Sequence, residues 1–229
     1  MLDFDGTILD TEQPVYQSWA ELWQNHDVEL SRSRWQAVIG TNGVFDPWME
    51  LQQVLGRRLN PALLEQRRQR RDALQAGYVP RDGILEWLAE ARRLKVAVAV
   101  ASSSPVEWVA GHLERLGLGE HFGAVVCRDD LVPAKPDPTS YREACRRLGA
   151  RPAWSVAVED SAHGVAAARA AGLYTIAVPH GLTADLDLSA ADLVVSSLSS
   201  LSLGDALRRA RQRDPHGGEA GDRPWGGEV

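Results

Sequence analysis

The segment VAVAVASSSPVE at residues 96–107 decides the fold class. Its first six residues, 96–101, are uninterrupted aliphatic side chains, which is typical of a strand buried on both faces. Residues 104–107 then place a serine three positions before a glutamate, with a proline at the first helical position, and so predict a helix start with a capping box. A buried strand that leads directly into a helix is the repeating unit of a parallel α/β sheet.

The same strand-then-helix pattern recurs along the chain. Short apolar segments predict further strands at residues 124–127, 155–158, 174–178 and 193–195. Helices are expected between them, and glycines are placed to end these helices at Gly117, Gly149 and Gly172. The strands lack polar alternation, which indicates a parallel sheet covered by helices on both faces and hence an α/β fold.

Two regions depart from this pattern. Residues 13–78 contain no convincing strand and carry apolar side chains at helical spacing, beginning with Val15, Trp19, Leu22 and Trp23. Residues 209–229 have no periodicity and are rich in glycine and charge, so we expect a disordered tail there.

Composition excludes several classes of partner. The 229 residues carry a net charge of −6, whereas a nucleic-acid-binding protein usually has a basic excess. The longest purely aliphatic run has six residues, and a membrane helix needs about 20. Cys127 and Cys145 have no CxxC spacing and the N-terminus has no secretory signal pattern, so we expect reduced thiols in a cytoplasmic protein.

Chemically active side chains gather where the expected strands end. They are four carboxylates, a hydroxyl cluster and a lysine: Asp3, Asp5, Glu159, Asp160, Ser102 to Ser104 and Lys135. Because ligands bind at the carboxyl ends of parallel strands, we expect these side chains on one rim. Carboxylates suit Mg²⁺, which favours phosphate oxygens, and a lysine supplies a point charge for phosphate.

The pair Asp3 and Asp5 adds catalytic potential. Their two-residue spacing in an extended segment directs both side chains to the same side, where repulsion raises one pKa and keeps that group able to act as an acid. A carboxylate can also attack phosphorus as a nucleophile. Ser102 stands at the mouth of the next helix and adds a hydroxyl and backbone N–H groups to an anion site.

Each of these features has a simpler explanation when taken alone. A capped turn explains two nearby aspartates, a loop explains three serines, and solvation explains a lone lysine, whereas an acidic pair also favours a helix start. Their occurrence together and in this order favours a shared site. His163 is expected to be a helix-start residue without a chemical role. The arginines between residues 57 and 71 form either a solvated face or a surface that steers an anionic substrate.

These residues resemble the motifs of the haloacid dehalogenase superfamily, and more narrowly its beta-phosphoglucomutase-like phosphatases. The run DFDGTILDTE at residues 3–12 matches the first motif, and the other three motifs are matched by Ser102, Lys135 and Glu159-Asp160. The resemblance covers residues 1–205. It implies a Rossmann-like parallel-sheet core at residues 1–12 and 79–208 with an inserted all-helical cap at residues 13–78.

The resemblance also implies a role for each motif residue. Asp3 is expected to be the nucleophile, and Asp5 the general acid and base. The expected phosphate-binding residues are Ser102, Ser103, Lys135 and Thr11. The expected Mg²⁺ site comprises Asp3, Asp5 through its carbonyl, Glu159 and Asp160.

Three departures from the family pattern refine these expectations. Only two residues precede Asp3, so we expect the first strand to begin upstream of Met1. Val15 and Gly43 stand where the family's mutases carry a cap histidine and a cap arginine, which favours hydrolysis. True haloacid dehalogenases lack the second aspartate of the first motif. This chain has it as Asp5, which disfavours carbon–halogen chemistry.

The expected function is therefore hydrolysis of a small phosphorylated metabolite, a sugar or polyol phosphate, by a Mg²⁺-dependent monomeric phosphatase through an aspartyl-phosphate. Two alternatives stay open from the sequence, a sugar-phosphate mutase of the beta-phosphoglucomutase type and an inactive phospholigand-binding protein.

Overall fold

The computed structural model describes residues 1–41, 45–129 and 131–213. Its parallel strands form two ladders. One ladder pairs β1 (Ala99–Ala101) with β2 (Ala124–Val126), and the other pairs β3 (Val156–Glu159), β4 (Tyr174–Ala177) and β5 (Leu193–Val194). Each strand lies within or overlaps a segment predicted from the apolar runs, although β1 keeps only the last three of six expected residues.

The N-terminal residues join the two ladders into one sheet. Leu2 forms parallel bridges to Val100 on one side and Val158 on the other. The Leu2 N–H donates to the Ala99 carbonyl at 2.8 Å, and the Asp3 N–H donates to the Val158 carbonyl at 3.0 Å. The order across the sheet is therefore β2, β1, residues 1–3, β3, β4 and β5, which places Asp3 at the centre of the carboxyl edge.

Large and small side chains alternate between the two faces of the sheet. Val100 and Val158 point to an apolar cluster that also contains side chains of α5 (Ile84–Leu94), α6 (Val106–Leu116) and α9 (Leu203–Arg213). Ala99 and Ala157 point to the opposite cluster, with α7 (Thr139–Leu148) and α8 (Ala162–Ala170). The valine–alanine alternation in the sequence thus lets α7 and α8 pack closely on one face while branched side chains fill the other.

Helix boundaries follow the glycine signals but not the predicted capping box. Gly117 and Gly149 end α6 and α7 in the left-handed conformation, with φ of 66° and 61°. At the start of α6 the N-cap residue is Pro105, with no side-chain cap bond, and the Ser104 hydroxyl one residue earlier donates to the Asp5 carboxylate. The predicted capping box is therefore wrong.

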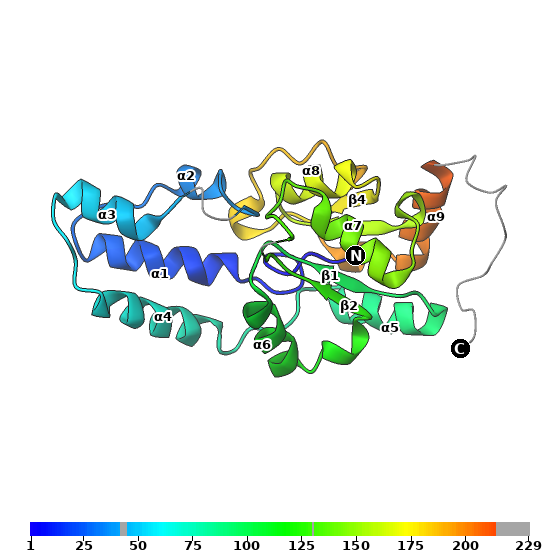
Figure 1. Cartoon of the computed structure of the whole chain (residues 1–229), viewed down its shortest axis with the longest axis horizontal. Coiled ribbons are helices and arrows are strands. Elements are labelled where there is room, and N and C mark those ends of the chain that lie inside the picture. Colours follow the sequence, from blue (N-terminus) through cyan, green and yellow to red (C-terminus); the bar gives the residue numbers. More distant parts are fainter. Residues whose placement is uncertain (42–44, 130, 214–229) are drawn as a thin grey trace.

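The cap is a separate helical lobe beside the carboxyl edge of the sheet (Figure 1). It contains α1 (Glu12–Gln24), α2 (Arg32–Gln36), α3 (Pro47–Leu55) and α4 (Ala62–Gln75), and α4 packs along α1. Its apolar cluster is built largely from tryptophans and leucines, including Trp19, Trp23, Trp35 and Leu51.

Contacts between the cap and the core fix the cap above this edge. Leu182 of the core is buried within the cap's apolar cluster. The Gln36 side chain donates to the Leu182 carbonyl at 2.7 Å, and the Ser103 hydroxyl donates to the Gly40 carbonyl at 3.0 Å. Segments that follow the strands therefore lie in direct contact with the cap.

The remaining elements complete the chain. Short 3-10 turns are η1 (Gly119–His121), η2 (Pro152–Trp154), η3 (Gly181–Thr183) and η4 (Leu198–Ser200). Helix α9 extends to Arg213, so residues 209–213 are helical and the disordered tail predicted from residue 209 is wrong for these five positions. The rest of that prediction, residues 214–229, lies outside the described residues, as does Gly43. None of the described helices is long and apolar enough to span a membrane.

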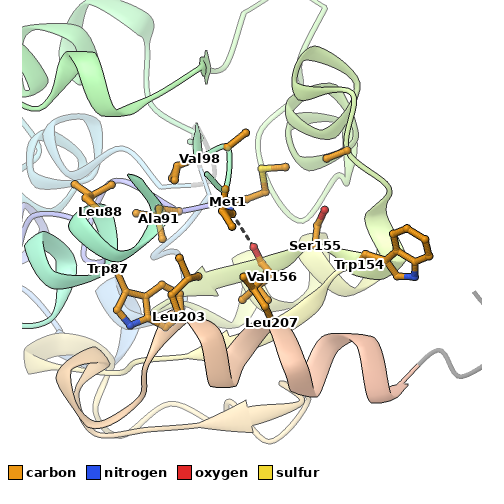
Figure 2. A pocket seen from close by; sticks show the side chains of 14 residues that line it. Met1, Trp87, Leu88, Ala91, Val98, Trp154, Ser155, Val156, Leu203 and Leu207 are labelled. Atoms are coloured by element: carbon orange, nitrogen blue, oxygen red, sulfur yellow. Dashed lines mark hydrogen bonds between the residues drawn. The ribbon is translucent and has the colours of Figure 1, made fainter. Parts of the chain in front are cut away.

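An apolar pocket lies at the amino end of the sheet (Figure 2). It is bordered by Met1, by side chains of α5 and α9 such as Trp87 and Leu207, and by residues that lead into β1 and β3, such as Val98. The Met1 ammonium group donates to the Val156 carbonyl at 2.7 Å, and burial lowers its pKa to about 6. This pocket is at the opposite end of the strands from the acidic side chains, so it is not the site that the motifs predict.

Candidate active site

Asp3 lies at the carboxyl edge, directly beside Lys135. The Lys135 Nζ is 2.5 Å from Asp3 Oδ1 and 2.5 Å from Glu159 Oε1, and Lys135 is only 2% exposed. Burial alone lowers the pKa of the Lys135 ammonium, but Asp3 and Glu159 outweigh that effect and raise it. Lys135 is therefore a fixed positive charge between two carboxylates, which excludes the solvated-lysine explanation.

Glu159 anchors this lysine from the end of β3. Its Oε1 also accepts a hydrogen bond from the Tyr141 hydroxyl at 2.5 Å, and its Oε2 accepts one from the Ser161 hydroxyl at 3.3 Å. Gly164 packs so closely that a Cβ there would lie 1.9 Å from Glu159 Oε2. The glycine after the fourth motif therefore makes room for a buried carboxylate.

Asp160 is a buried carboxylate at the end of β3, next to Glu159. It is 1% exposed, and its Oδ2 has no hydrogen-bond partner among the described residues. Oxygens of Asp3, Glu159 and Asp160 all lie within 4.8 Å of one another. Burial raises the pKa of the Asp3 and Asp160 carboxyls well above their ordinary values, although Lys135 lowers that of Asp3.

This donor set fits a divalent cation. Burying several carboxylates together is unfavourable without a compensating charge, and oxygen ligands suit a hard ion such as Mg²⁺. The unpartnered Asp160 Oδ2 and the clustered Asp3 carboxylate are the open positions, whereas Lys135, Tyr141 and Ser161 already hold Glu159. A backbone carbonyl of the adjoining loop could complete such a site.

Asp5 is held apart from this cluster. Its Oδ1 accepts hydrogen bonds from the Thr11 hydroxyl at 2.6 Å and the Trp108 indole N–H at 2.8 Å. Its Oδ2 accepts one from the Ser104 hydroxyl at 2.6 Å and a weaker one from Ser102 at 3.4 Å. From the two-residue spacing we expect both carboxylates to point to the same side. In the structure their surroundings differ, because Asp3 contacts a lysine and Asp5 accepts hydrogen bonds from neutral donors.

Ser103 and Thr11 are already engaged with protein groups. The Ser103 hydroxyl donates to the cap at Gly40 and accepts the Lys135 backbone N–H at 3.0 Å. The Thr11 hydroxyl donates to Asp5. In this structure both side chains shape the site, and their assignment to phosphate binding stays a prediction.

Several site residues were missed by the sequence reasoning. Tyr141 and Trp108 reach the carboxylates from helices, and no spacing in the sequence marks them. The Arg81 guanidinium donates to the Gly6 carbonyl, and to the Val178 carbonyl at 3.2 Å. His180 could have been found, because it follows β4 by the same strand-end rule that found the carboxylates.

His180 lies between two acidic side chains. Its Nδ1 is 3.5 Å from Asp10 Oδ2, and its Nε2 is 3.7 Å from Asp160 Oδ2. Burial lowers the pKa of His180, and Arg81 adds to that effect. His163, by contrast, places its Nδ1 3.1 Å from the Ile39 carbonyl of the cap, away from the carboxylates.

Several arginines of the cap form ion pairs with nearby acidic side chains, and their part in steering an anionic substrate stays a prediction. Arg68 and Arg70 pair with Glu65 and Glu21 on the cap surface. Arg71 pairs with Asp72 at 2.7 Å and also stacks over the Trp108 ring of the core, at 4.8 Å from its centroid. The Trp108 indole therefore contacts both Arg71 of the cap and Asp5 of the core.

Comparison with known proteins adds independent evidence. The sequence model of the family described as haloacid dehalogenase-like hydrolase matches residues 1–178. A Bacillus subtilis (strain 168) protein named "Putative phosphatase YhcW" is 36% identical over 204 residues, which cover 89% of this chain and 93% of the relative. Fructose-1-phosphate phosphatase YqaB of Escherichia coli (strain K12) is 30% identical over 188 residues, 78% of this chain and 94% of the relative.

A solved structure agrees with the sequence relatives. The structure of a mutant CbbY from Rhodobacter sphaeroides in complex with xylulose-(1,5)bisphosphate is similar with a TM-score of 0.71 and 27% identity, covering 90% of this chain and 96% of that chain. These findings confirm the α/β fold, a Rossmann-like parallel sheet with a helical cap. With a family model that spans most of the chain and two relatives at or above 30% identity, this chain belongs to the haloacid dehalogenase-like hydrolases.

Proposed function

We propose that this hydrolase is a Mg²⁺-dependent phosphatase that acts on a small phosphorylated metabolite, a sugar or polyol phosphate, through an aspartyl-phosphate. The observation that carries the proposal is the different setting of two aspartates two residues apart. Asp3 lies against Lys135 and beside Asp160, whereas Asp5 is held by Thr11 and by donors of the segment that begins at Ser102. Two carboxyl groups in different surroundings can take different roles in one reaction.

The first half-reaction transfers the phosphoryl group to Asp3. A carboxylate oxygen of Asp3 forms a bond to phosphorus while the bond from phosphorus to the ester oxygen breaks. Asp5 donates a proton to that leaving oxygen and is left as a carboxylate. Lys135 offsets the negative charge that gathers on the phosphoryl oxygens, and Ser102 adds a hydroxyl directly after β1.

The second half-reaction returns the enzyme to its starting state. The Asp5 carboxylate takes a proton from a water molecule, whose oxygen attacks phosphorus while the bond to Asp3 breaks. The products are inorganic phosphate and the free Asp3 carboxylate, with the proton back on Asp5. Asp3, Asp160 and the Asp5 carbonyl would hold Mg²⁺, with Glu159 beside them, and the ion would neutralise charge on the phosphoryl oxygens.

Sugar phosphates are the substrate class that the relatives support. One relative is named a fructose-1-phosphate phosphatase, and one similar structure holds xylulose-(1,5)bisphosphate. A relative named beta-phosphoglucomutase is 26% identical over 213 residues, so the mutase alternative has to be tested. Val15 supports hydrolysis, because it packs against the cap's apolar cluster and carries no group that could move a proton.

The test is phosphate release from a panel of phosphorylated sugars and polyols, measured with and without Mg²⁺. Asp3→Asn should abolish turnover, and Asp27→Asn, at an exposed position of the cap, should leave it unchanged. Interconversion of sugar 1- and 6-phosphates without phosphate release would establish the mutase instead. Binding of phosphorylated sugars without any turnover by the folded protein would establish the phospholigand-binding alternative.

A further inference from the structure

Trp108 and Ser104 contact Asp5 although neither the motifs nor the family comparison assigns them a part, and Trp108 is the larger of the two. It lies in the first turn of α6 and is half-buried, and its Nε1 donates to Asp5 Oδ1 at 2.8 Å. An indole N–H is only a donor, so this contact has a fixed polarity. Together with the Thr11 hydroxyl on the same oxygen and the Ser104 hydroxyl on the other, it holds the plane of the Asp5 carboxyl group.

The indole ring is itself fixed from two sides. His112, one turn further along α6, meets it edge-on with ring centroids 4.4 Å apart and an interplanar angle of 81°. Arg71 of α4 places its guanidinium carbon 4.8 Å from the Trp108 ring centroid. Both contacts have geometries in which an aromatic ring attracts its neighbour.

These two contacts come from different parts of the molecule. His112 belongs to the core, whereas Arg71 belongs to the cap, and α4 and α6 together line one cleft. Figure 1 shows the end of α4 approaching α6 below the sheet. The chain of contacts from Arg71 through Trp108 to Asp5 therefore connects the position of the cap with the orientation of a carboxyl group in the core.

We propose that Trp108 is a positioning residue that orients Asp5 for protonation of the leaving oxygen, and that Arg71 stabilises this orientation when the cap lies against the core. The proposal rests on the proposed function, because it assigns Trp108 a part in the reaction of that site. Its consequence is selective. A misoriented Asp5 impairs the release of an alkoxide, which needs a proton, more than the release of p-nitrophenolate, which leaves as an anion.

The experiment compares kcat/KM for glycerol phosphate and for p-nitrophenyl phosphate. This ratio of rate constants reports steps up to the first irreversible one, so the hydrolysis of the aspartyl-phosphate does not enter it. Trp108→Phe keeps an aromatic ring but removes the N–H. In this variant kcat/KM for glycerol phosphate should fall roughly tenfold more than kcat/KM for p-nitrophenyl phosphate. This loss is smaller than the loss expected when the general acid itself is removed. Asp5→Asn calibrates the full effect.

A matched control is available at the other end of the sheet. Trp154 also has an arginine over its ring, with the Arg151 guanidinium carbon 3.9 Å from the centroid, and it lies beside the pocket of Figure 2. Trp154→Phe should leave both values of kcat/KM unchanged. Equal losses on both substrates in Trp108→Phe, or no loss, would overturn the proposal for Trp108.

A double-mutant cycle tests the connection to the cap. Arg71→Gln should lower the glycerol phosphate to p-nitrophenyl phosphate ratio severalfold in the wild-type background and have no further effect in the Trp108→Phe background, because residues that act through one contact are not additive. Additive losses would overturn the part played by Arg71. Absence of any Asp3-dependent turnover of p-nitrophenyl phosphate would instead overturn the proposed function, so the two failures are distinguishable.

Discussion

Replacing Lys135 by methionine isolates the charge at the centre of the site. Methionine has a similar length and no charge, so Lys135→Met leaves the Asp3 and Glu159 carboxylates facing each other without the ammonium group that contacts both at 2.5 Å. The side chains of Lys135 and Glu159 are 1% and 0% exposed, so water cannot screen the loss. Breaking a buried ion pair by removing one partner typically destabilises a protein by about 3–5 kcal/mol.

Urea unfolding measures this effect. With a denaturant slope of roughly 2–3 kcal/mol per molar, the expected loss lowers the unfolding midpoint by roughly 1–2.5 M. The control is Lys95→Met, since Lys95 is the other lysine of the chain and is exposed at the end of α5. A surface change of that kind typically alters stability by less than about 0.5 kcal/mol.

The pH dependence of the loss gives a second readout. The pKa of Asp3 is already raised by burial, and Lys135 is the charge that lowers it, so the pKa of Asp3 should rise further in the variant. A carboxyl with a raised folded-state pKa binds more protons folded than unfolded, so stability returns as the pH falls below that pKa. The deficit should therefore shrink between pH 8 and pH 5. A variant as stable as Lys95→Met at pH 8 would refute the assignment of Lys135 as the compensating charge.

The remaining predictions address the other parts of the site. Asp5→Asn should lower kcat/KM for alkyl phosphates by about 10²–10⁴-fold, whereas Asp27→Asn should not, and unchanged rates would remove Asp5 from its role. Gly164→Ala should abolish turnover and destabilise the protein by about 1–3 kcal/mol, because its Cβ would displace Glu159, while Gly111→Ala, which meets open space in α6, should be tolerated. Mg²⁺ should raise the unfolding temperature more at pH 8 than at pH 5.5, because protons compete for Asp3 and Asp160, whose folded-state pKa values are raised; an equal rise at both pH values would contradict the assigned cation site. Leu182→Ala should destabilise the protein by about 2–5 kcal/mol, since the side chain is buried in the cap, and a calorimetric scan that shows no change would argue against this contact as a fastening of cap to core.

Local signals were enough to predict the alternation of strands and helices, but not the exact extent of each strand. The apolar run at residues 96–101 is twice the length of β1, because apolar side chains do not by themselves determine which residues pair, and Ala97 is exposed in the structure. In the structure the ladder of β1 with β2 starts at Ala99, opposite Ala124, whereas the Val96 N–H donates to the Ala91 carbonyl of α5 at 2.9 Å. Pairing is a property of two segments, so one segment cannot reveal it.

The sequence predicts which residues lie together at the site better than it predicts how their side chains are oriented. Strand ends converge in any parallel sheet, which is why Asp3, Lys135, Glu159 and Asp160 could be grouped before the structure was known. The direction of the Asp5 carboxylate could not, because it depends on the Trp108 indole and on a Ser104 hydroxyl that the local pattern assigned to a helix cap. The Ser104 hydroxyl donates to a carboxylate and does not accept a backbone N–H of the helix, and tertiary structure alone decides between those two partners.

Lys135 also explains an asymmetry in the composition. The chain has 25 basic residues, of which only Lys95 and Lys135 are lysines. At Lys135 the available space is defined by two carboxylate oxygens at 2.5 Å and by the Tyr141 ring, whose centroid is 5.0 Å from Nζ. An ammonium group is a compact point charge that fits between these groups, whereas a guanidinium is a planar fork that would have to displace Tyr141 or Glu159. On the surface arginine and lysine both serve as solvated cations, as the exposed Lys95 does, whereas at Lys135 the size of the cation matters.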